Sequence, residues 1–179
     1  MLTAKHGQSP IDVSKKSIVD EKIIPGIING VGKGLVAETS GDDILFVWLT
    51  DSGRTKDVVS ALAQHQHEAR IERIWSGTAL QLLFPSAQED SRAPDIVIEP
   101  ELGVIYAKPN NTGIAEHGGF GEEDTHVPLL IANPGIKALE IHAAVQTTQI
   151  APTILRLFGL DPNQLKAVQI ERTQVLPGL

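Results

Sequence analysis

The sequence has no cysteine, one methionine, one tyrosine and two tryptophans among its 179 residues. The lack of cysteine excludes disulfide bonds and thiolate metal ligands, but it does not identify the compartment in which the protein works. No run of apolar residues reaches the length needed to cross a membrane, and we expect no signal peptide at Met1. The sequence therefore points away from a membrane protein and leaves the localisation open.

Basic residues are also scarce, with 15 lysines and arginines against 22 acidic residues and a formal net charge of -7. This balance argues against a nucleic-acid polymer as partner, because such proteins need positive charge to bind phosphates. Hydrophobic residues make up 41% and charged residues 21%, which is typical of a globular chain. An acidic protein that handles phosphoesters usually needs metal ions to neutralise the substrate locally.

The most informative stretch is a glycine-rich, acidic loop that begins at Glu116. It contains His117 and His126 and leads into an apolar run over residues 127–132, which predicts a strand. A polar, glycine-rich loop beside a strand is how α/β enzymes present ligands at a sheet edge. The alternative is a solvated acidic loop before a buried strand.

A second His-Gly step lies near the N-terminus, at His6-Gly7, again after short apolar residues that could end a strand. Two such steps after two strands fit a metal site assembled at one end of a sheet. Neutral imidazole is a good ligand for zinc and related metals, and the adjoining glycine lets backbone and substrate come close. We therefore predict that His6 and His117 lie near one another, each in a loop that follows a strand.

Three segments in this order resemble the C-terminal part of the alkaline phosphatase superfamily. They are Ala4-Lys5-His6-Gly7, the stretch from Glu116 to Ile131, and the stretch from Thr148 to Leu160. The branch they resemble is that of the type I phosphodiesterases and nucleotide pyrophosphatases. The resemblance covers residues of about 1–12 and 94–162 and is loose between them.

This resemblance implies an α/β fold, namely part of an alkaline-phosphatase-like sheet flanked by helices, with a small α/β insertion at about residues 36–93. It implies a metal-dependent hydrolase acting on a small-molecule phosphoester, with a divalent metal, commonly zinc, held by His6 and His117. The family's nucleophilic Thr or Ser segment has no counterpart, so no catalytic residue is assigned. We expect a C-terminal piece of a larger enzyme, inactive alone, whose exposed sheet edges would favour self-association.

Lys5 departs from the family pattern, because it stands where the family has an aspartate ligand. A protonated lysine cannot ligate zinc and would repel it, which leaves Lys5 as a candidate to bind a substrate phosphate. His126 is a candidate outer partner of the site, a cap of the following strand, or a ligand. His65 and His67 could chelate a metal or could interact favourably with the end of the helix before them.

Three functions remain open at this point. The first is the phosphodiesterase-like or pyrophosphatase-like hydrolase. The second is a non-catalytic remnant or interaction module of the same fold. The third is a sulfatase-like relative, in which the family's single calcium site also uses the aspartate that Lys5 replaces.

Hydropathy patterns and turn residues predict the remaining elements. Strands are expected at residues 43–49, 71–75, 95–100, 103–107 and 139–142. Helices are expected at residues 55–66, with Val58, Val59, Leu62 and Ala63 inward, and at 150–158. Residues 13–22 are expected to form a short helix or an exposed loop. The glycine-rich segment 23–34 lacks the spacing of a phosphate-binding loop and is expected to be a turn between strands.

Overall fold

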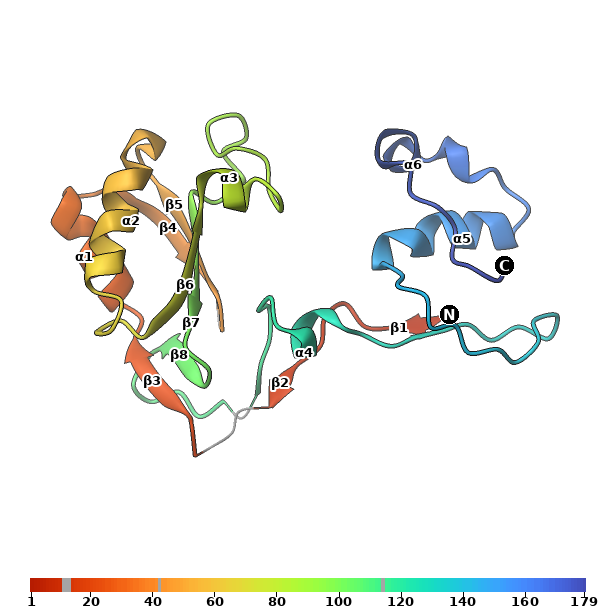
Figure 1. The fold of residues 1–179 in the computed structure, drawn as a ribbon, viewed down its shortest axis with the longest axis horizontal. Coiled ribbons are helices and arrows are strands. Elements are labelled where there is room, and N and C mark those ends of the chain that lie inside the picture. Colours follow the sequence, from red (N-terminus) through yellow and green to blue (C-terminus); the bar gives the residue numbers. More distant parts are fainter. Residues whose placement is uncertain (11–13, 42, 114) are drawn as a thin grey trace. The chain divides into compact units, whose positions relative to one another are not determined.

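The computed structural model describes residues 1–10, 14–41, 43–113 and 115–179 and shows a mixed α/β fold (Figure 1). The chain divides into two compact units, Met1–Ile131 and Ala132–Leu179. Within the described residues, every helix is too short or too polar to span a membrane. The α/β class expected from the sequence is therefore confirmed.

The largest sheet of the first unit has four strands in the order β4-β5-β7-β6, and neighbouring strands run antiparallel. Its strands are β4 (Val36–Ser40), β5 (Leu45–Leu49), β6 (Ile71–Ser76) and β7 (Ile96–Pro100). The near-continuous apolar run of β5 places apolar side chains on both faces of the sheet, since successive side chains of a strand point to opposite sides. Leu45, Val47 and Leu49 are buried on one face, and Phe46 packs on the other.

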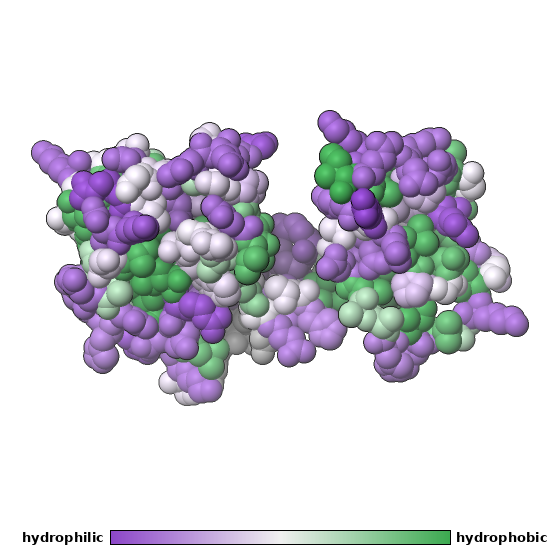
Figure 2. Space-filling view, turned by 45° about the horizontal axis from the view of Figure 1, so that its top comes forward, coloured by the Kyte–Doolittle hydropathy of each residue, from purple (hydrophilic) through white to green (hydrophobic). Residues whose placement is uncertain are grey.

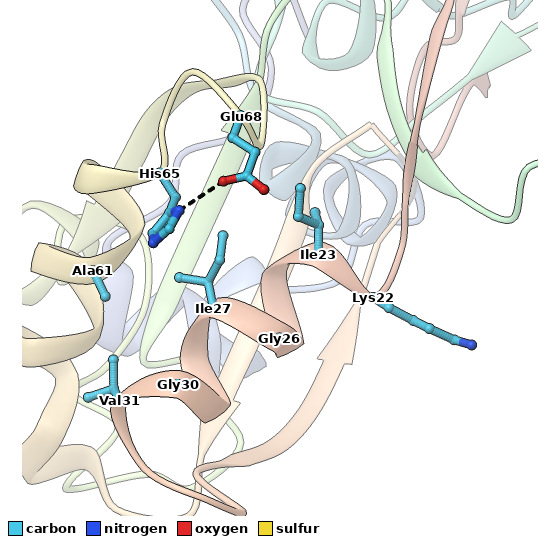
Figure 3. Close-up of a pocket in the computed structure, with 9 residues that line it drawn as sticks. All are labelled: Lys22, Ile23, Gly26, Ile27, Gly30, Val31, Ala61, His65 and Glu68. Atoms are coloured by element: carbon cyan, nitrogen blue, oxygen red, sulfur yellow. Dashed lines mark hydrogen bonds and ion pairs between the residues drawn. The ribbon is translucent and has the colours of Figure 1, made fainter.

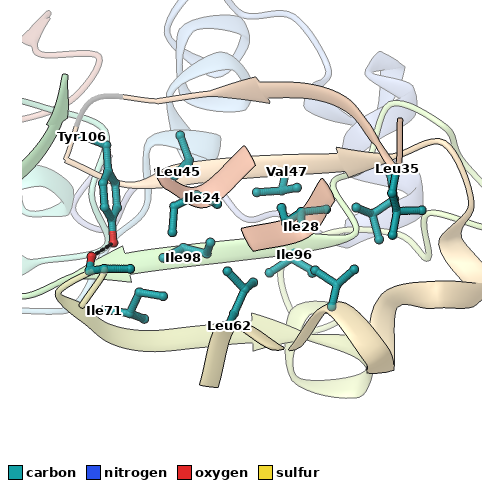
Figure 4. Packing of buried hydrophobic residues seen from close by; sticks show 13 residues of the cluster. Ile24, Ile28, Leu35, Leu45, Val47, Leu62, Ile71, Ile96, Ile98 and Tyr106 are labelled. Atoms are coloured by element: carbon teal, nitrogen blue, oxygen red, sulfur yellow. Dashed lines mark hydrogen bonds between the residues drawn. The ribbon is translucent and has the colours of Figure 1, made fainter. Parts of the chain in front are cut away.

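Helices α1 (Ile23–Val31) and α2 (Thr55–Gln64) cover one face of this sheet (Figure 1). Each presents a pair of residues four positions apart, Ile24 and Ile28 in α1 and Val58 and Leu62 in α2, and all four are fully buried. Fully burying one such side chain contributes roughly 1.5–3 kcal/mol. Figure 4 shows this interior and labels Ile24, Ile28, Leu35, Leu45, Val47, Leu62, Ile71, Ile96, Ile98 and Tyr106.

A smaller apolar cluster lies on the opposite face of the sheet. Its buried members are Ile44, Val97 and Leu80 of the short helix α3 (Gly77–Leu80). The partly buried aromatic residues packed against it are Phe46, Trp75, Phe84 and Phe120. Phe120 belongs to the histidine-bearing loop, so this cluster connects the sheet to that loop.

Three further strand pairs complete the first unit. Strand β3 (Ser17–Asp20) runs parallel to β8 (Val104–Ala107). The other two pairs are antiparallel and only two residues long: β1 (Leu2–Thr3) with β10 (Leu129–Leu130), and β2 (Ser9–Pro10) with β9 (Ala115–Glu116). These two pairs bring the N-terminal segment beside the residues that flank the glycine-rich loop.

The second unit contains helix α5 (Ile150–Leu157), helix α6 (Lys166–Glu171) and the short 3-10 helices η2 (Thr147–Gln149) and η3 (Pro162–Gln164). Thr153 is fully buried; its hydroxyl donates to the carbonyl of Gln149 and accepts from the amide of Leu176. Gly159, with φ of 71°, follows the end of α5 as predicted. Apolar residues remain at the molecular surface among the hydrophilic ones (Figure 2). Phe158 and Leu139 of the second unit are among the exposed apolar side chains.

Several predicted elements need correction. Residues 23–34 contain helix α1 rather than a turn, because Gly26 and Gly30 fall on its exposed side while Ile24 and Ile28 carry the packing. Residues 13–22 contain strand β3 instead of a helix or loop, and Val13 lies outside the described residues. The strand predicted at 139–142 is wrong, since those residues are irregular and exposed.

Other predictions hold with changed limits. The strand expected at 127–132 is reduced to β10, with Leu130 exposed. Ala63 was expected to face inward but is exposed, because the inward stripe of α2 runs through Val58 and Leu62. Strands β7 and β8 are both present, although they belong to different sheets and do not pair with each other.

Candidate functional site

His6 and His117, the two histidines singled out from the sequence, lie side by side in the first unit. Their imidazole rings stack with centroids 4.2 Å apart and an interplanar angle of 16°. His6 follows strand β1 and His117 follows strand β9, although the two residues are far apart in the chain. The prediction that they lie close together, each in a loop after a strand, is confirmed.

The N-terminal His-Gly step is fixed by two backbone contacts. Nδ1 of His6 lies 2.7 Å from the carbonyl oxygen of Gly7. Because a carbonyl only accepts, Nδ1 carries the hydrogen, and in the neutral ring the lone pair is then on Nε2. The amide of Gly7 donates to the carbonyl of Asp124 at 2.7 Å, which ties His6 to helix α4 (Glu122–Thr125).

Two carboxylates, those of Asp43 and Asp124, approach the turn that follows His117. A methyl group placed on Gly119 would lie 2.8 Å from Oδ2 of Asp124 and 3.2 Å from Oδ2 of Asp43. Both oxygens therefore lie against a position that only glycine leaves open. Asp124 is 5% exposed, and Oδ1 of Asp43 is buried with no hydrogen-bond partner among the described residues.

The proximity of these carboxylates changes the titration of Asp43. Partial burial, followed by the negative charge of Asp124, raises the pKa of Asp43 to about 6. Glu116, next to His117 in the chain, adds a smaller contribution in the same direction. The turn after His117 is therefore a region of concentrated negative charge, which a cation would relieve.

The described side chains around the stacked histidines do not form a complete metal site. Within the part of the chain that the structure describes, no group of three or more histidine, aspartate or glutamate side chains converges on one point. A protein zinc site generally needs at least three such ligands. His6 and His117 supply two imidazoles, and further ligands would be needed to complete a metal site.

The other residues singled out from the sequence lie apart from this pair or play local roles. Lys5 is exposed beside His6. His126 is exposed and lies 3.4 Å from Glu122, one helical turn earlier. His65 ends helix α2 and pairs with Glu68 at 2.9 Å, and His67 is exposed in the turn that follows.

A groove of about 570 Å³ lies between helices α1 and α2 (Figure 3). It is open because Gly26 and Gly30 carry no side chains there, and a methyl group on either would meet nothing within 4 Å. Ile27 lines the groove, and the pair of His65 and Glu68 borders it. This groove is separate in sequence and in structure from the stacked histidines.

Asp43 is the residue of this region that sequence reasoning missed. In the sequence, Asp43 is only the first residue of the predicted strand at 43–49, because a single aspartate before an apolar run is ordinary. Its position against Gly119 is a tertiary contact with no local signal. Asp124 lay within the predicted loop, but nothing in the sequence distinguished it from its acidic neighbours.

Comparison of this chain with protein-family models, with curated proteins and with solved structures finds no match.

Proposed function

We propose that this chain forms part of a metal-dependent hydrolase of small-molecule phosphoesters. Its type would be that of the phosphodiesterases and nucleotide pyrophosphatases of the alkaline phosphatase superfamily. The observation that carries the proposal is the stack of His6 and His117 at 4.2 Å, formed by two His-Gly steps that are distant in sequence. The same two steps carry the family resemblance, so motif and geometry point to the same residues.

In this proposal each imidazole contributes to a divalent metal, zinc being the first choice. Two-metal hydrolases hold their ions roughly 4 Å apart, so ligands of neighbouring ions come from adjacent side chains. Such a metal, when bound, supplies Lewis-acid stabilisation of the phosphoryl oxygens. The residues of this chain would hold and orient the ion: the Gly7 carbonyl fixes the His6 ring so that Nε2 is available.

Zinc binding by the purified chain tests the proposal. We expect the wild type to bind zinc in equilibrium dialysis at pH 7.5, and His6→Ala or His117→Ala to weaken binding at least tenfold. His142→Ala is the matched control, because its side chain is 84% exposed and lies in the second unit. Equal zinc binding by all four proteins would contradict the assignment of the ligands.

An assay of phosphodiester hydrolysis tests whether the chain alone is catalytically active. Because no nucleophile is assigned, we expect no enzyme-like hydrolysis of bis-p-nitrophenyl phosphate by the chain alone. Steady hydrolysis that His117→Ala abolishes would show that these 179 residues suffice. Activity on p-nitrophenyl sulfate instead would favour a sulfatase-like relative.

A non-catalytic module of the same fold is the second candidate. The observation that favours it is the shortage of converging ligands among the residues that the structure describes. Such a module should bind little zinc even at micromolar metal concentrations. The dialysis experiment therefore distinguishes the two functions directly.

Lys5 provides a further test of the metal site. A lysine is charged at neutral pH and would oppose a nearby dication. Lys5→Asp replaces that charge with the carboxylate that the resemblance expects beside His6, so we expect more zinc bound per chain. Lys5→Gln is the control, since it removes the charge without adding a ligand. Unchanged zinc binding in Lys5→Asp would show that Lys5 does not occupy a ligand position.

A further inference from the structure

The loop that carries His117 is attached to the four-stranded sheet through Phe120. Only Gly118 and Gly119 separate the histidine from this phenylalanine. The Phe120 ring packs against the cluster of Ile44, Leu80 and Val97 on the sheet face that the long helices leave uncovered. It meets Trp75 of β6 edge to face, with ring centroids 6.0 Å apart and an interplanar angle of 85°.

A second contact holds the same turn. Gly119 lies so close to Asp43 that a methyl group would come within 3.2 Å of its Oδ2, and Asp43 directly precedes Ile44 of the apolar cluster. Gly118 adopts a φ of 100°, a conformation that side-chain-bearing residues rarely tolerate. The turn is thus a tight connection between the imidazole of His117 and an apolar anchor on the sheet.

This anchor matters because the link consists of two glycines. A Gly-Gly segment has more conformational freedom than any other dipeptide, so the position of His117 depends on its fixed neighbours, which are strand β9, paired with β2, on one side and Phe120 on the other. The opposite ring, His6, is held separately through the hydrogen bond from Gly7 to the carbonyl of Asp124. Both sides must be fixed for two imidazoles to remain 4.2 Å apart.

We propose that Phe120 is a positioning residue: its packing against Trp75 on the sheet holds the ring of His117 in its stacked position on the ring of His6. The proposal deepens the proposed function, since it states how the candidate metal ligands are arranged. It assigns the four-stranded sheet a role in the site that goes beyond stability. Trp75 becomes a reporter of the loop, because its indole contacts the anchor directly.

The experiment compares three variants of the full chain: Phe120→Ala, Phe120→Leu and Phe84→Ala. Phe84 is the matched control, because it packs on the same cluster and meets Phe46 at the same 6.0 Å and 85° without belonging to the histidine loop. The readouts are the nuclear Overhauser contacts between the two imidazoles, the zinc Kd, and the emission of Trp75 in a Trp48→Phe background.

We expect Phe120→Ala to abolish the contacts between the imidazoles, to raise the zinc Kd about tenfold and to shift the emission of Trp75 to the red. Phe120→Leu should retain most of the imidazole contacts, since a large apolar side chain still packs against Trp75 and the apolar cluster. Phe84→Ala should lower the Tm as Phe120→Ala does, yet leave the imidazole contacts and the zinc Kd unchanged.

The outcomes separate this proposal from the proposed function. If the wild type binds no zinc but Phe120→Ala still loses the imidazole contacts, the positioning role of Phe120 is supported and the assignment of His6 and His117 as metal ligands is refuted. If Phe120→Ala binds zinc as the wild type does and keeps the imidazole contacts, Phe120 does not position His117. The assignment of His6 and His117 as metal ligands then still stands. Equal loss of contacts in Phe84→Ala also overturns the proposal, because the effect would then come from the sheet as a whole.

Discussion

Two regions of the first unit are built on different principles. The layered region, residues 17–107, closes two helices over a four-stranded sheet and buries a continuous apolar interior. The histidine region, residues 1–10 and 115–131, has strands of only two residues and carries the stacked imidazoles and the buried carboxylate of Asp124, which Asp43 of the layered region approaches at Gly119. Apolar packing dominates the first, and polar side chains in close approach dominate the second.

The difference shows where stability and chemistry reside in this chain. The layered region is stabilised by burial of apolar surface, to which no ionisable side chain has to contribute. Close, partly buried carboxylates cost free energy unless they share a proton or meet a cation. Two contacts join the histidine region to the layered region: Phe120 packs on the apolar cluster of the sheet, and Gly119 lies against Asp43. Mutations should then affect the two regions differently.

The largest effect is expected in the layered region, for Leu62→Ala. Leu62 is fully buried between α2 and the sheet, and truncating such a leucine costs about 2–5 kcal/mol in transfer and cavity energy. Urea denaturation should show this loss in the free energy of unfolding. Leu82→Ala is the control, because Leu82 is 83% exposed and should change stability by less than about 0.5 kcal/mol. Similar losses in both variants would contradict the layered core.

A pair of glycine substitutions sharpens the contrast between the regions. Gly119→Ala places a methyl group 2.8 Å from Oδ2 of Asp124, so the buried carboxylate must move, at an expected cost of about 1–2 kcal/mol. Gly26→Ala in α1 meets nothing within 4 Å and should stabilise the protein by about 0.4–1 kcal/mol. Thermal unfolding measures both. Opposite signs are expected; a destabilised Gly26→Ala or a neutral Gly119→Ala would contradict the local packing.

The sequence predicted the histidine pair and much of the layered region, for identifiable reasons. Helix α2 was predictable because Val58 and Leu62 repeat at helical spacing, and β5 because its apolar run is uninterrupted. Helix α1 was missed because its glycines dominate the local pattern, and only packing shows that they fall on the exposed side. The placement of Phe120 on Trp75 and of Asp43 on Gly119 depends on tertiary contacts, which local patterns do not encode.

The smallest expected effect concerns the pH dependence of stability and arises at Asp43, where the layered region contacts the histidine region. The pKa of Asp43 is raised from 3.8 to about 6, chiefly by burial and then by the charge of Asp124. The folded protein therefore binds this proton more tightly than the unfolded chain does. The contribution of Asp43 to stability should be largest below about pH 4, fall as the pH rises towards 6, and then level off.

Asp43→Asn removes this titration, so its free energy of unfolding should lack the fall between pH 4 and 6. Because Asp43 is only partly buried, solvent screening should keep the difference below about 1 kcal/mol. Asp90→Asn is the control: Arg92 lowers the pKa of Asp90 from 3.8 to about 2, so the contribution of Asp90 rises with pH and cannot produce a fall between pH 4 and 6. Urea denaturation in the presence of a chelator, from pH 4 to 8, measures all three proteins. A fall that persists in Asp43→Asn would mean that another group titrates there and that the contact of Asp43 with the histidine loop does not control it.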